Sequence, residues 1–140
     1  MEAIRWVIVD TGPLTAFLDR SEAHHQWAVK QFKRIMGPLL TSEPVITEVL
    51  FLLRRHVAAQ QEVLNLIARG ALRIGFDLEE EIEAVRDLRG KYASVPMSLA
   101  DASLVRMAEV HEGYHVCTLD SDFAIYRKHG RGEIPLITPG

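Results

Sequence analysis

The chain has little of three features that would place it in other classes of protein. It contains one cysteine, Cys117, so no disulfide can form within it, and the apolar neighbours of Cys117 indicate a small core residue in a reducing compartment. No apolar run approaches the ~20 residues that span a bilayer, and the N-terminus lacks the basic region and long apolar stretch of a signal peptide. With 140 residues, 48% of them apolar, the sequence predicts one soluble, cytoplasmic domain over residues 1–140.

Several binding and catalytic motifs are absent as well. Gly12 belongs neither to a GxGxxG nor to a GxxxxGK(S/T) motif, which argues against a glycine-rich nucleotide cradle. No GxSxG motif is present, which argues against an α/β-hydrolase nucleophile. His24 and His25 have no partner histidine or cysteine at a spacing typical of zinc sites.

The chain also lacks the excess of basic residues that is typical of nucleic-acid-binding proteins, because its net charge is −3. Acids that hold cations would leave a nearly neutral surface, so the charge neither supports nor excludes a nucleic-acid substrate. Arg127 and Lys128 follow an acidic segment directly. We predict that they bind substrate phosphate, although a role in surface solubility explains them equally well.

Against this background, acidic residues recur in or directly beside segments that read as buried. An isolated buried carboxylate is so costly that such groups are normally paired, protonated or bound to metal. Their recurrence along one short chain predicts a shared divalent-cation site and metal-assisted hydrolysis. The five acids are Asp10, Glu48, Asp101, Asp120 and Asp122.

Apolar, β-rich runs alternate with amphipathic patterns along the chain, which predicts an α/β fold with a mostly parallel sheet. Strands are expected over residues 4–10, 39–41, 71–76, 114–119 and 134–137. Longer helices are expected over residues 22–35, 42–55, 78–88 and 98–109, and another follows residue 55 and ends at residue 68. Short helices are expected after Gly12-Pro13 and from Asp122. Ser42 is expected to cap its helix, and Gly90 to stop the acidic one.

Helix placement brings the acids to one edge of this sheet. In parallel α/β folds, helices begin at the carboxyl edge, where ligands bind. Asp10 and Asp120 end strands at that edge, and Asp101 lies in the first turn of its helix. Glu48 shares an inward stripe with Val45, Val49 and Leu52, so it is expected to face the protein body.

Most of the acids also have a purely structural explanation. Asp10 precedes Thr-Gly-Pro, which is good turn chemistry, and Asp101 closes a Ser-Leu-Ala-Asp segment that resembles a capping box. Asp120 and Asp122 suit a helix N-terminus because of the helix dipole. Glu48 has no such explanation, because capping does not require an acid among Val, Leu and Phe. Taken together, the coincidences favour one shared site.

Sites made of carboxylates alone suit hard cations such as Mg²⁺ and Mn²⁺. We expect Asp10 and Asp120 to be the principal ligands, with Glu48 and Asp101 completing the site directly or through water. The sequence leaves open whether one or two metal ions act.

Four segments, taken in order, resemble the successive motifs of PIN-domain proteins. They are Val9-Asp10-Thr11-Gly12-Pro13-Leu14, the helix that contains Glu48, Ser98-Leu99-Ala100-Asp101-Ala102 and Thr118-Leu119-Asp120-Ser121-Asp122-Phe123. They span nearly the whole chain, and their order is more specific than any one of them. Within the family, the chain is most similar to the stand-alone prokaryotic VapC-type ribonucleases.

The resemblance implies a PIN-like three-layer α/β/α sandwich with a mostly parallel sheet of order 3-2-1-4-5. It also implies a Mg²⁺- or Mn²⁺-dependent endoribonuclease, commonly dimeric, that is the toxin of a type II toxin–antitoxin (VapBC) pair and is held inactive by a small VapB-type antitoxin. Carried over by position, the catalytic and metal-binding acids are Asp10, Glu48, Asp101 and Asp120, the fifth metal-binding position is Asp122, and the polar neighbours of the site are Thr11 and Thr118.

The helices expected from residues 22 and 42 carry apolar stripes that are broad for one small sheet. We therefore predict a homodimer, with Trp27 and Phe51 as partly exposed contacts. The antitoxin is expected to place an arginine or lysine in the acidic pocket.

Three alternatives stay open. A PIN-domain nuclease could act in RNA processing or on DNA without a toxin role, and a PIN protein that has lost catalysis could only bind nucleic acid. A phosphotransfer domain with Asp10 as nucleophile is disfavoured, because position 12 is glycine and residues 134–137 offer no lysine.

Overall fold

The computed structural model describes residues 2–140, and five parallel strands form its central sheet. In chain order they are β2 (Val7–Val9), β4 (Leu39–Thr41), β5 (Leu72–Ile74), β6 (His115–Cys117) and β9 (Leu136–Ile137). Their order across the sheet is β5-β4-β2-β6-β9, and every neighbouring pair is parallel. Counted along the chain, this order is 3-2-1-4-5, so the predicted α/β fold and topology are confirmed.

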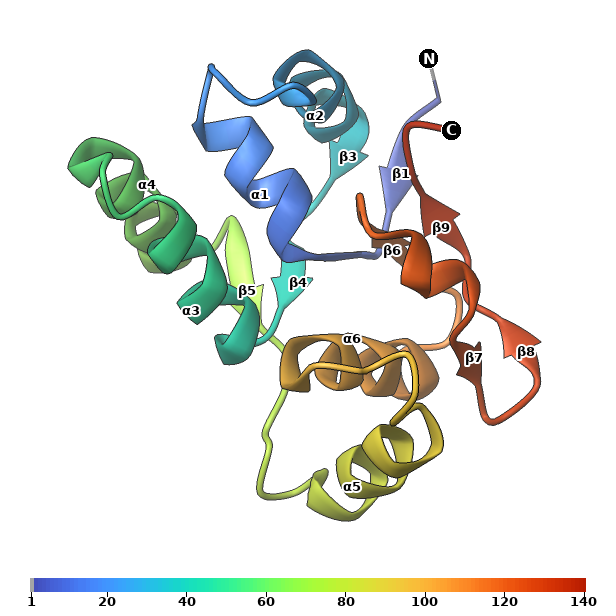
Figure 1. The fold of residues 1–140 in the computed structure, drawn as a ribbon. Helices are drawn as coiled ribbons and strands as arrows, with labels where there is room; N and C mark the ends of the chain where they lie inside the picture. The colour runs from blue at the N-terminus through green and yellow to red at the C-terminus, as the bar shows by residue number, and fades with distance from the viewer. Residues whose placement is uncertain (1) are drawn as a thin grey trace.

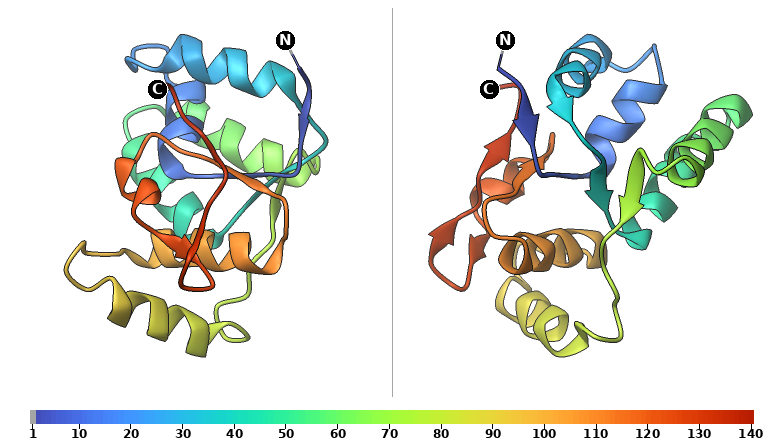
Figure 2. Two further views of the ribbon diagram at one scale, coloured as in Figure 1. Left: turned by 90° about the vertical axis from the view of Figure 1, so that its right-hand side faces the viewer. Right: turned by 180° about the vertical axis from the view of Figure 1, so that it is seen from behind.

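Helices cover both faces of the sheet. The first three sheet strands are connected by α1 (Thr11–Leu18), α2 (His25–Arg34), α3 (Glu43–Leu52) and α4 (Val57–Ala68). The chain then crosses to β6 through α5 (Ile82–Lys91) and α6 (Leu99–Val110). The first four helices lie on one side of the sheet, and α6 lies on the other with α5 packed beyond it (Figures 1 and 2).

Smaller elements complete the chain. Two strands, β1 (Ile4–Arg5) and β3 (Ile35–Met36), pair in parallel beside the main sheet. After β6 come a short 3₁₀ helix, η1 (Ser121–Ala124), and an antiparallel hairpin of β7 (Arg127–Lys128) and β8 (Gly132–Glu133). The sequence did not predict this hairpin, because its strands lack any apolar alternation.

The core sits on the central strand. All three residues of β2 are fully buried, as expected for a strand with helices on both faces. On one side α6 covers β2 and β6, and it buries Leu104, Val105 and Met107. The apolar run that predicted the first strand therefore lies in the fully buried core.

The predicted first strand, residues 4–10, is in fact interrupted at Trp6. Trp6 has a φ of 65°, a left-handed conformation that costs a non-glycine residue roughly 1–2 kcal/mol. The kink moves the chain from one partner to others, because β1 pairs with β3 whereas β2 pairs with β4 and β6. Hydrophobicity alone could not reveal this change of neighbours.

Two helix boundaries also differ from the sequence prediction. The expected helix over residues 22–35 begins only at His25, because Asp19 holds the backbone and hydroxyl of Ser21 in a turn. The expected acidic helix over residues 78–88 runs instead from Ile82 to Lys91, and Gly90 lies inside it rather than stopping it. The acidic run before it forms turns, one of which is closed by Asp77 accepting from the Glu80 amide.

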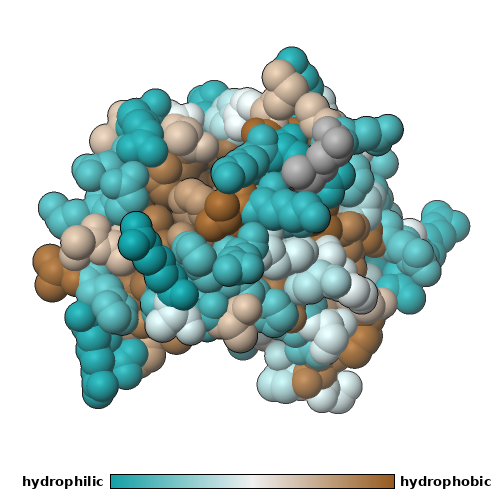
Figure 3. Space-filling view, turned by 90° about the horizontal axis from the view of Figure 1, so that it is seen from above, coloured by the Kyte–Doolittle hydropathy of each residue, from teal (hydrophilic) through white to brown (hydrophobic). Residues whose placement is uncertain are grey.

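The surface is mixed in character. Seen from above, hydrophilic residues surround a central group of hydrophobic ones (Figure 3). Among residues 2–140, no helix is both long and apolar enough to cross a membrane.

The position of Gly90 within α5 yields a stability prediction. A Cβ added at Gly90 meets no atom within 4 Å, so Gly90→Ala should raise the free energy of unfolding, by about 0.5–1 kcal/mol, because alanine loses less backbone entropy in a helix. Gly70→Ala is the matched control, because Gly70 has a φ of +80° and alanine there is strained. Urea unfolding measures both. A loss of stability in Gly90→Ala would contradict the helical assignment.

Candidate functional site

Three of the predicted acids lie at the carboxyl edge of the sheet, each at the start of a helix. Asp10 follows β2 and caps α1, and its Oδ1 accepts from the Thr11 amide at 2.7 Å. Asp120 follows β6 and caps η1, and its Oδ1 accepts from the Asp122 amide at 2.9 Å. Asp101 lies in the first turn of α6, where its amide donates to the Ser98 hydroxyl at 3.0 Å. Capping thus fixes where these acids stand.

The fourth acid comes from α3, which the fold holds against α6. Ser42 occupies the N-cap position of α3 as predicted, but its hydroxyl makes no capping bond. It bonds instead to the Ser103 hydroxyl of α6 at 2.7 Å, with both residues fully buried. This link joins the helix of Glu48 to the helix of Asp101.

Four of the predicted acids line one cleft with a volume of about 270 Å³. Its walls are formed by Asp10, Thr11, Gly12, Glu48, Asp101, Leu119 and Asp120. A Cβ at Gly12 would lie only 3.1 Å from the Leu119 side chain, so the lack of a side chain lets α1 approach the loop after β6. Residues far apart in the sequence therefore converge on this cleft. The expected inward stripe of α3 is only partly correct, because Val45 and Val49 are buried whereas Glu48 and Leu52 are exposed.

Three carboxylates among residues 2–140 lie close enough together to share a cation, those of Asp101, Asp120 and Asp122. One carboxylate oxygen from each lies within 4.8 Å of the others, a spacing at which one cation could bind all three. Oxygen-only ligand sets of this kind suit Mg²⁺ or Mn²⁺. Asp122 thus joins Asp120 more closely than expected, whereas Asp10 lines the cleft but lies outside this group of three.

Asp10 is the most deeply buried of the acids, with a relative exposure of 6%. The pKa of its carboxyl is raised to about 6, mainly by burial and to a smaller extent by the charges of Asp101 and Asp120, while the hydrogen bonds from Thr118 and Thr11 oppose the rise. Burial also raises the pKa of Asp101 above its ordinary value, with the charge of Asp120 adding to the effect. Among residues 2–140, no lysine, arginine or histidine lines this cleft.

Two threonines hold the acids in place, as the sequence analysis expects. The Thr118 hydroxyl donates to Asp10 Oδ2 at 2.7 Å and accepts from the Asp120 amide at 2.9 Å, so one fully buried group ties two acids together. The Thr11 hydroxyl donates to Glu48 Oε1 at 2.7 Å. Thr11 therefore links Glu48 to the end of β2.

One residue at the site escaped the sequence analysis. The hydroxyl of Tyr126 donates to Asp101 Oδ2 at 2.8 Å, and the Tyr126 side chain is fully buried. Burial and this bond both raise the pKa of the Tyr126 hydroxyl, which therefore stays protonated and acts as a donor. No sequence motif marks Tyr126, which stands four residues after Asp122 in an irregular segment.

Residues 7–128 match the family model of the PIN domain. The chain belongs to the PIN domain family. The matched range contains all five acids of the site, and the resemblance recognised in the sequence is confirmed.

Two mycobacterial proteins are similar to this PIN domain over most of its length. Ribonuclease VapC26 of Mycobacterium tuberculosis (strain ATCC 25618 / H37Rv) is 28% identical over 134 residues, which cover 94% of this chain and 99% of that protein. The crystal structure of Mycobacterium tuberculosis VapC20, a Sarcin-Ricin loop cleaving toxin, aligns with a TM-score of 0.74 at 21% identity, covering 85% and 93% of the two chains. The second match bears on the fold alone.

Arg127 and Lys128, the predicted substrate-binding pair of this PIN domain, both contact other residues of the same chain. Arg127 Nη1 donates to three backbone carbonyls, those of residues 124, 125 and 126, and so braces the turn after η1. Lys128 Nζ lies 3.1 Å from the carboxylate of Glu112. In this structure neither side chain contacts the acids of the cleft, and their role in substrate binding stays a prediction.

The raised pKa of Asp10 predicts how stability depends on pH. Without metal, the unfolded chain loses the Asp10 proton near pH 3.8, whereas the folded chain keeps it until about pH 6. Stability from this group is therefore complete below pH 3.8 and is lost as the pH rises to about 6, a loss on the order of 3 kcal/mol. Asp10→Asn does not titrate, so it should gain stability relative to the wild type over this range.

Urea unfolding in a chelator, from pH 4 to pH 7.5, measures this effect as the difference between Asp10→Asn and the wild type. Glu83→Gln, at an exposed position of α5, is the control and should show no such trend. A difference that stays constant across the pH range would contradict the desolvated state of Asp10.

Proposed function

We propose that this PIN domain is a divalent-metal-dependent endoribonuclease that hydrolyses RNA phosphodiester bonds, and that it is the toxin of a type II toxin–antitoxin pair. The observation that carries the proposal is the convergence of Asp10, Glu48, Asp101 and Asp120 on one cleft. The similarity to ribonuclease VapC26 over 94% of the chain supports RNA as the substrate class.

The donor set fits a Mg²⁺ or Mn²⁺ ion. Two carboxylates about 5 Å apart repel each other by about 3 kcal/mol at an effective dielectric constant near 20. The trio Asp101, Asp120 and Asp122 therefore gains from a cation that replaces repulsion by attraction. These three would hold the ion, and Asp10 and Glu48 would complete the site directly or through water.

The protein supplies a fixed arrangement of charge for the reaction. A divalent ion in such a site activates a water molecule and stabilises negative charge on the scissile phosphate. The threonine hydroxyls keep Asp10 and Glu48 oriented into the cleft, so that little reorganisation is needed when RNA binds. The buried position of Asp10 strengthens its interaction with any cation in the cleft.

Removing the acids tests the catalytic part of the proposal. Asp10→Ala and Asp120→Ala should each abolish most metal-dependent RNA cleavage, and the double variant should be hardly worse, because groups that act as one unit have non-additive effects. Asp101→Asn and Glu48→Gln remove charge while keeping shape, and they should have a similar effect. The measurement is single-turnover cleavage of one structured RNA with and without Mn²⁺.

The variants are checked for folding by circular dichroism. Glu83→Gln serves as the control, because it removes an exposed charge that does not line the cleft. Normal folding and wild-type cleavage by both Asp10→Ala and Glu48→Gln would overturn the shared-metal mechanism. Cleavage of DNA but not RNA would favour the alternative of a DNA-directed nuclease.

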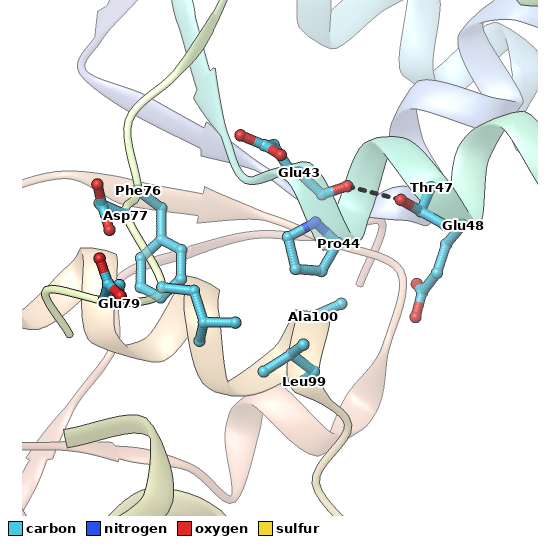
Figure 4. A pocket seen from close by; sticks show the side chains of 10 residues that line it. Glu43, Pro44, Thr47, Glu48, Phe76, Asp77, Glu79, Leu99 and Ala100 are labelled. Atoms are coloured by element: carbon cyan, nitrogen blue, oxygen red, sulfur yellow. Dashed lines mark hydrogen bonds between the residues drawn. The ribbon is translucent and has the colours of Figure 1, made fainter. Parts of the chain in front are cut away.

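A larger pocket of about 650 Å³ lies beside the cleft and shares Glu48 with it. The rings of Phe76 and Pro44 and the side chain of Leu99 face its interior (Figure 4). Carboxylates lie around it, and no lysine or arginine lines it. The lining acids are Glu43, Glu48, Asp77 and Glu79. A basic segment with apolar anchor residues, such as the end of a small VapB-type antitoxin, is complementary to this pocket.

The end of α3 supports the proposed homodimer. Phe51 is 61% exposed, Leu52 51% and Val57 70%, so three large apolar side chains lie uncovered where α3 gives way to α4. Arg54 stacks on the Phe51 ring, with 4.2 Å between the guanidinium carbon and the ring centroid. Trp27, the other contact proposed from the sequence, is half-buried against the core. A second copy of the chain would cover this patch.

Two variants separate the partner surfaces. Phe51→Lys should convert a dimer to a monomer in light scattering, whereas Glu43→Lys with Glu79→Lys should leave the dimer intact and abolish co-purification with the product of an adjacent antitoxin gene. A strict monomer at high wild-type concentration would remove the dimer. Failure of every neighbouring gene product to bind would favour an RNA-processing nuclease without a toxin role.

A further inference from the structure

Tyr126 makes an unusual contact for a fully buried tyrosine. Its hydroxyl donates to Asp101 Oδ2 at 2.8 Å, across 25 residues of sequence. A buried hydroxyl without a partner is costly, so the polar atom has to be satisfied by some acceptor in the interior. Here the acceptor is a carboxylate that also faces the acidic cleft.

This bond is the side-chain anchor of Asp101. The amide of Asp101 is held by Ser98, which places the backbone, but a side chain on a fixed backbone still has several rotamers. Of the hydrogen bonds that stabilise the Asp101 carboxylate, the one from the Tyr126 hydroxyl has the largest effect, and those from the backbone and side chain of Ser98 have smaller ones. The Tyr126 hydroxyl occupies Oδ2, and one carboxylate oxygen of Asp101 stands within 4.8 Å of oxygens of Asp120 and Asp122.

Aromatic packing fixes the tyrosine itself. The Tyr126 ring meets Tyr92 edge to face at a centroid distance of 5.0 Å and Phe123 at 5.2 Å. The Tyr92 hydroxyl is used elsewhere, because it accepts from the Arg127 amide at 3.0 Å. Packing of the Tyr126 ring between the rings of Tyr92 and Phe123 thus leaves the Tyr126 hydroxyl little freedom to leave Asp101.

We propose that Tyr126 is a positioning residue of the metal centre, whose hydroxyl aims the Asp101 carboxylate at the point shared with Asp120 and Asp122. The inference rests on the proposed metal-dependent function and names a residue that acts through Asp101 rather than on RNA. Phenylalanine would fill the same space, so packing alone explains the ring but not the hydroxyl. Outer hydrogen bonds of this kind typically change metal affinity about 10- to 100-fold.

Two matched tyrosine variants test the proposal. Tyr126→Phe removes the hydroxyl that holds Asp101, and Tyr92→Phe removes a hydroxyl from the same aromatic cluster that contacts no acid. Calorimetric titration with Mn²⁺ alone should show affinity reduced about tenfold or more in Tyr126→Phe and little changed in Tyr92→Phe. Equal affinity in Tyr126→Phe and the wild type, or an equal loss in both variants, would overturn the positioning role.

A metal-independent measurement separates this proposal from the proposed function. Tyr126→Phe should lower the melting temperature in the wild-type background, where it removes the hydroxyl that donates to Asp101. In an Asp101→Ala background the same change should cost far less or raise the melting temperature, because it removes an unpaired hydroxyl. An equal loss in both backgrounds would show that the Tyr126 hydroxyl stabilises the fold without acting through Asp101, and this would overturn the inference. If the wild type binds no Mn²⁺, the metal centre itself fails, and this cycle alone decides whether Tyr126 orients Asp101.

Discussion

Repulsion among carboxylates is the constraint on which this structure depends. Five acids stand at one edge of a small sheet, and burial raises the pKa of Asp10 and Asp101. The charged forms of Asp10 and Asp101 are destabilised by loss of water and by neighbouring carboxylates. Carboxylates are rare at such positions in an ordinary core. A bound cation would offset the repulsion between them and the cost of their burial.

Hydrogen bonds from hydroxyl groups stabilise these carboxylates in the metal-free protein. Thr118 donates to Asp10, Thr11 to Glu48 and Tyr126 to Asp101, so each of these acids accepts a hydrogen bond from a neighbouring side chain. Neutral donors stabilise a carboxylate without adding a competing positive charge to the cleft. They also restrict rotation, so that the oxygens stay aimed at a common point. The same contacts thus serve both the stability of the fold and the geometry of the site.

Part of the site followed from sequence because it depends on local structure. Asp10 and Asp120 end parallel strands, and Asp101 begins a helix, so knowing that the sheet is parallel was enough to bring them to one edge. Glu48 was singled out as an acid in an apolar helical stripe, but Glu48 and Leu52 are exposed, so the Glu48 side chain reaches the cleft from the edge of the helix rather than from a buried face. Tyr126 was not recognisable, because its segment has no periodicity and its partner lies 25 residues away. Similarly, Gly90 reads as a helix end, yet packing of α5 against α6 carries the helix past it.

The sequence by itself determined the class of fold, the order of its strands through family resemblance, and the identity of the acids. These features follow from hydrophobic periodicity, from the residues at strand and helix ends and from short motifs, all of which are local patterns in the sequence. Only the tertiary structure decided that Asp122 groups with Asp101 and Asp120, that Ser42 joins α3 to α6 and that Tyr126 holds Asp101. Those facts are distances between side chains on separate elements, and they depend on how the elements pack, which no local pattern encodes.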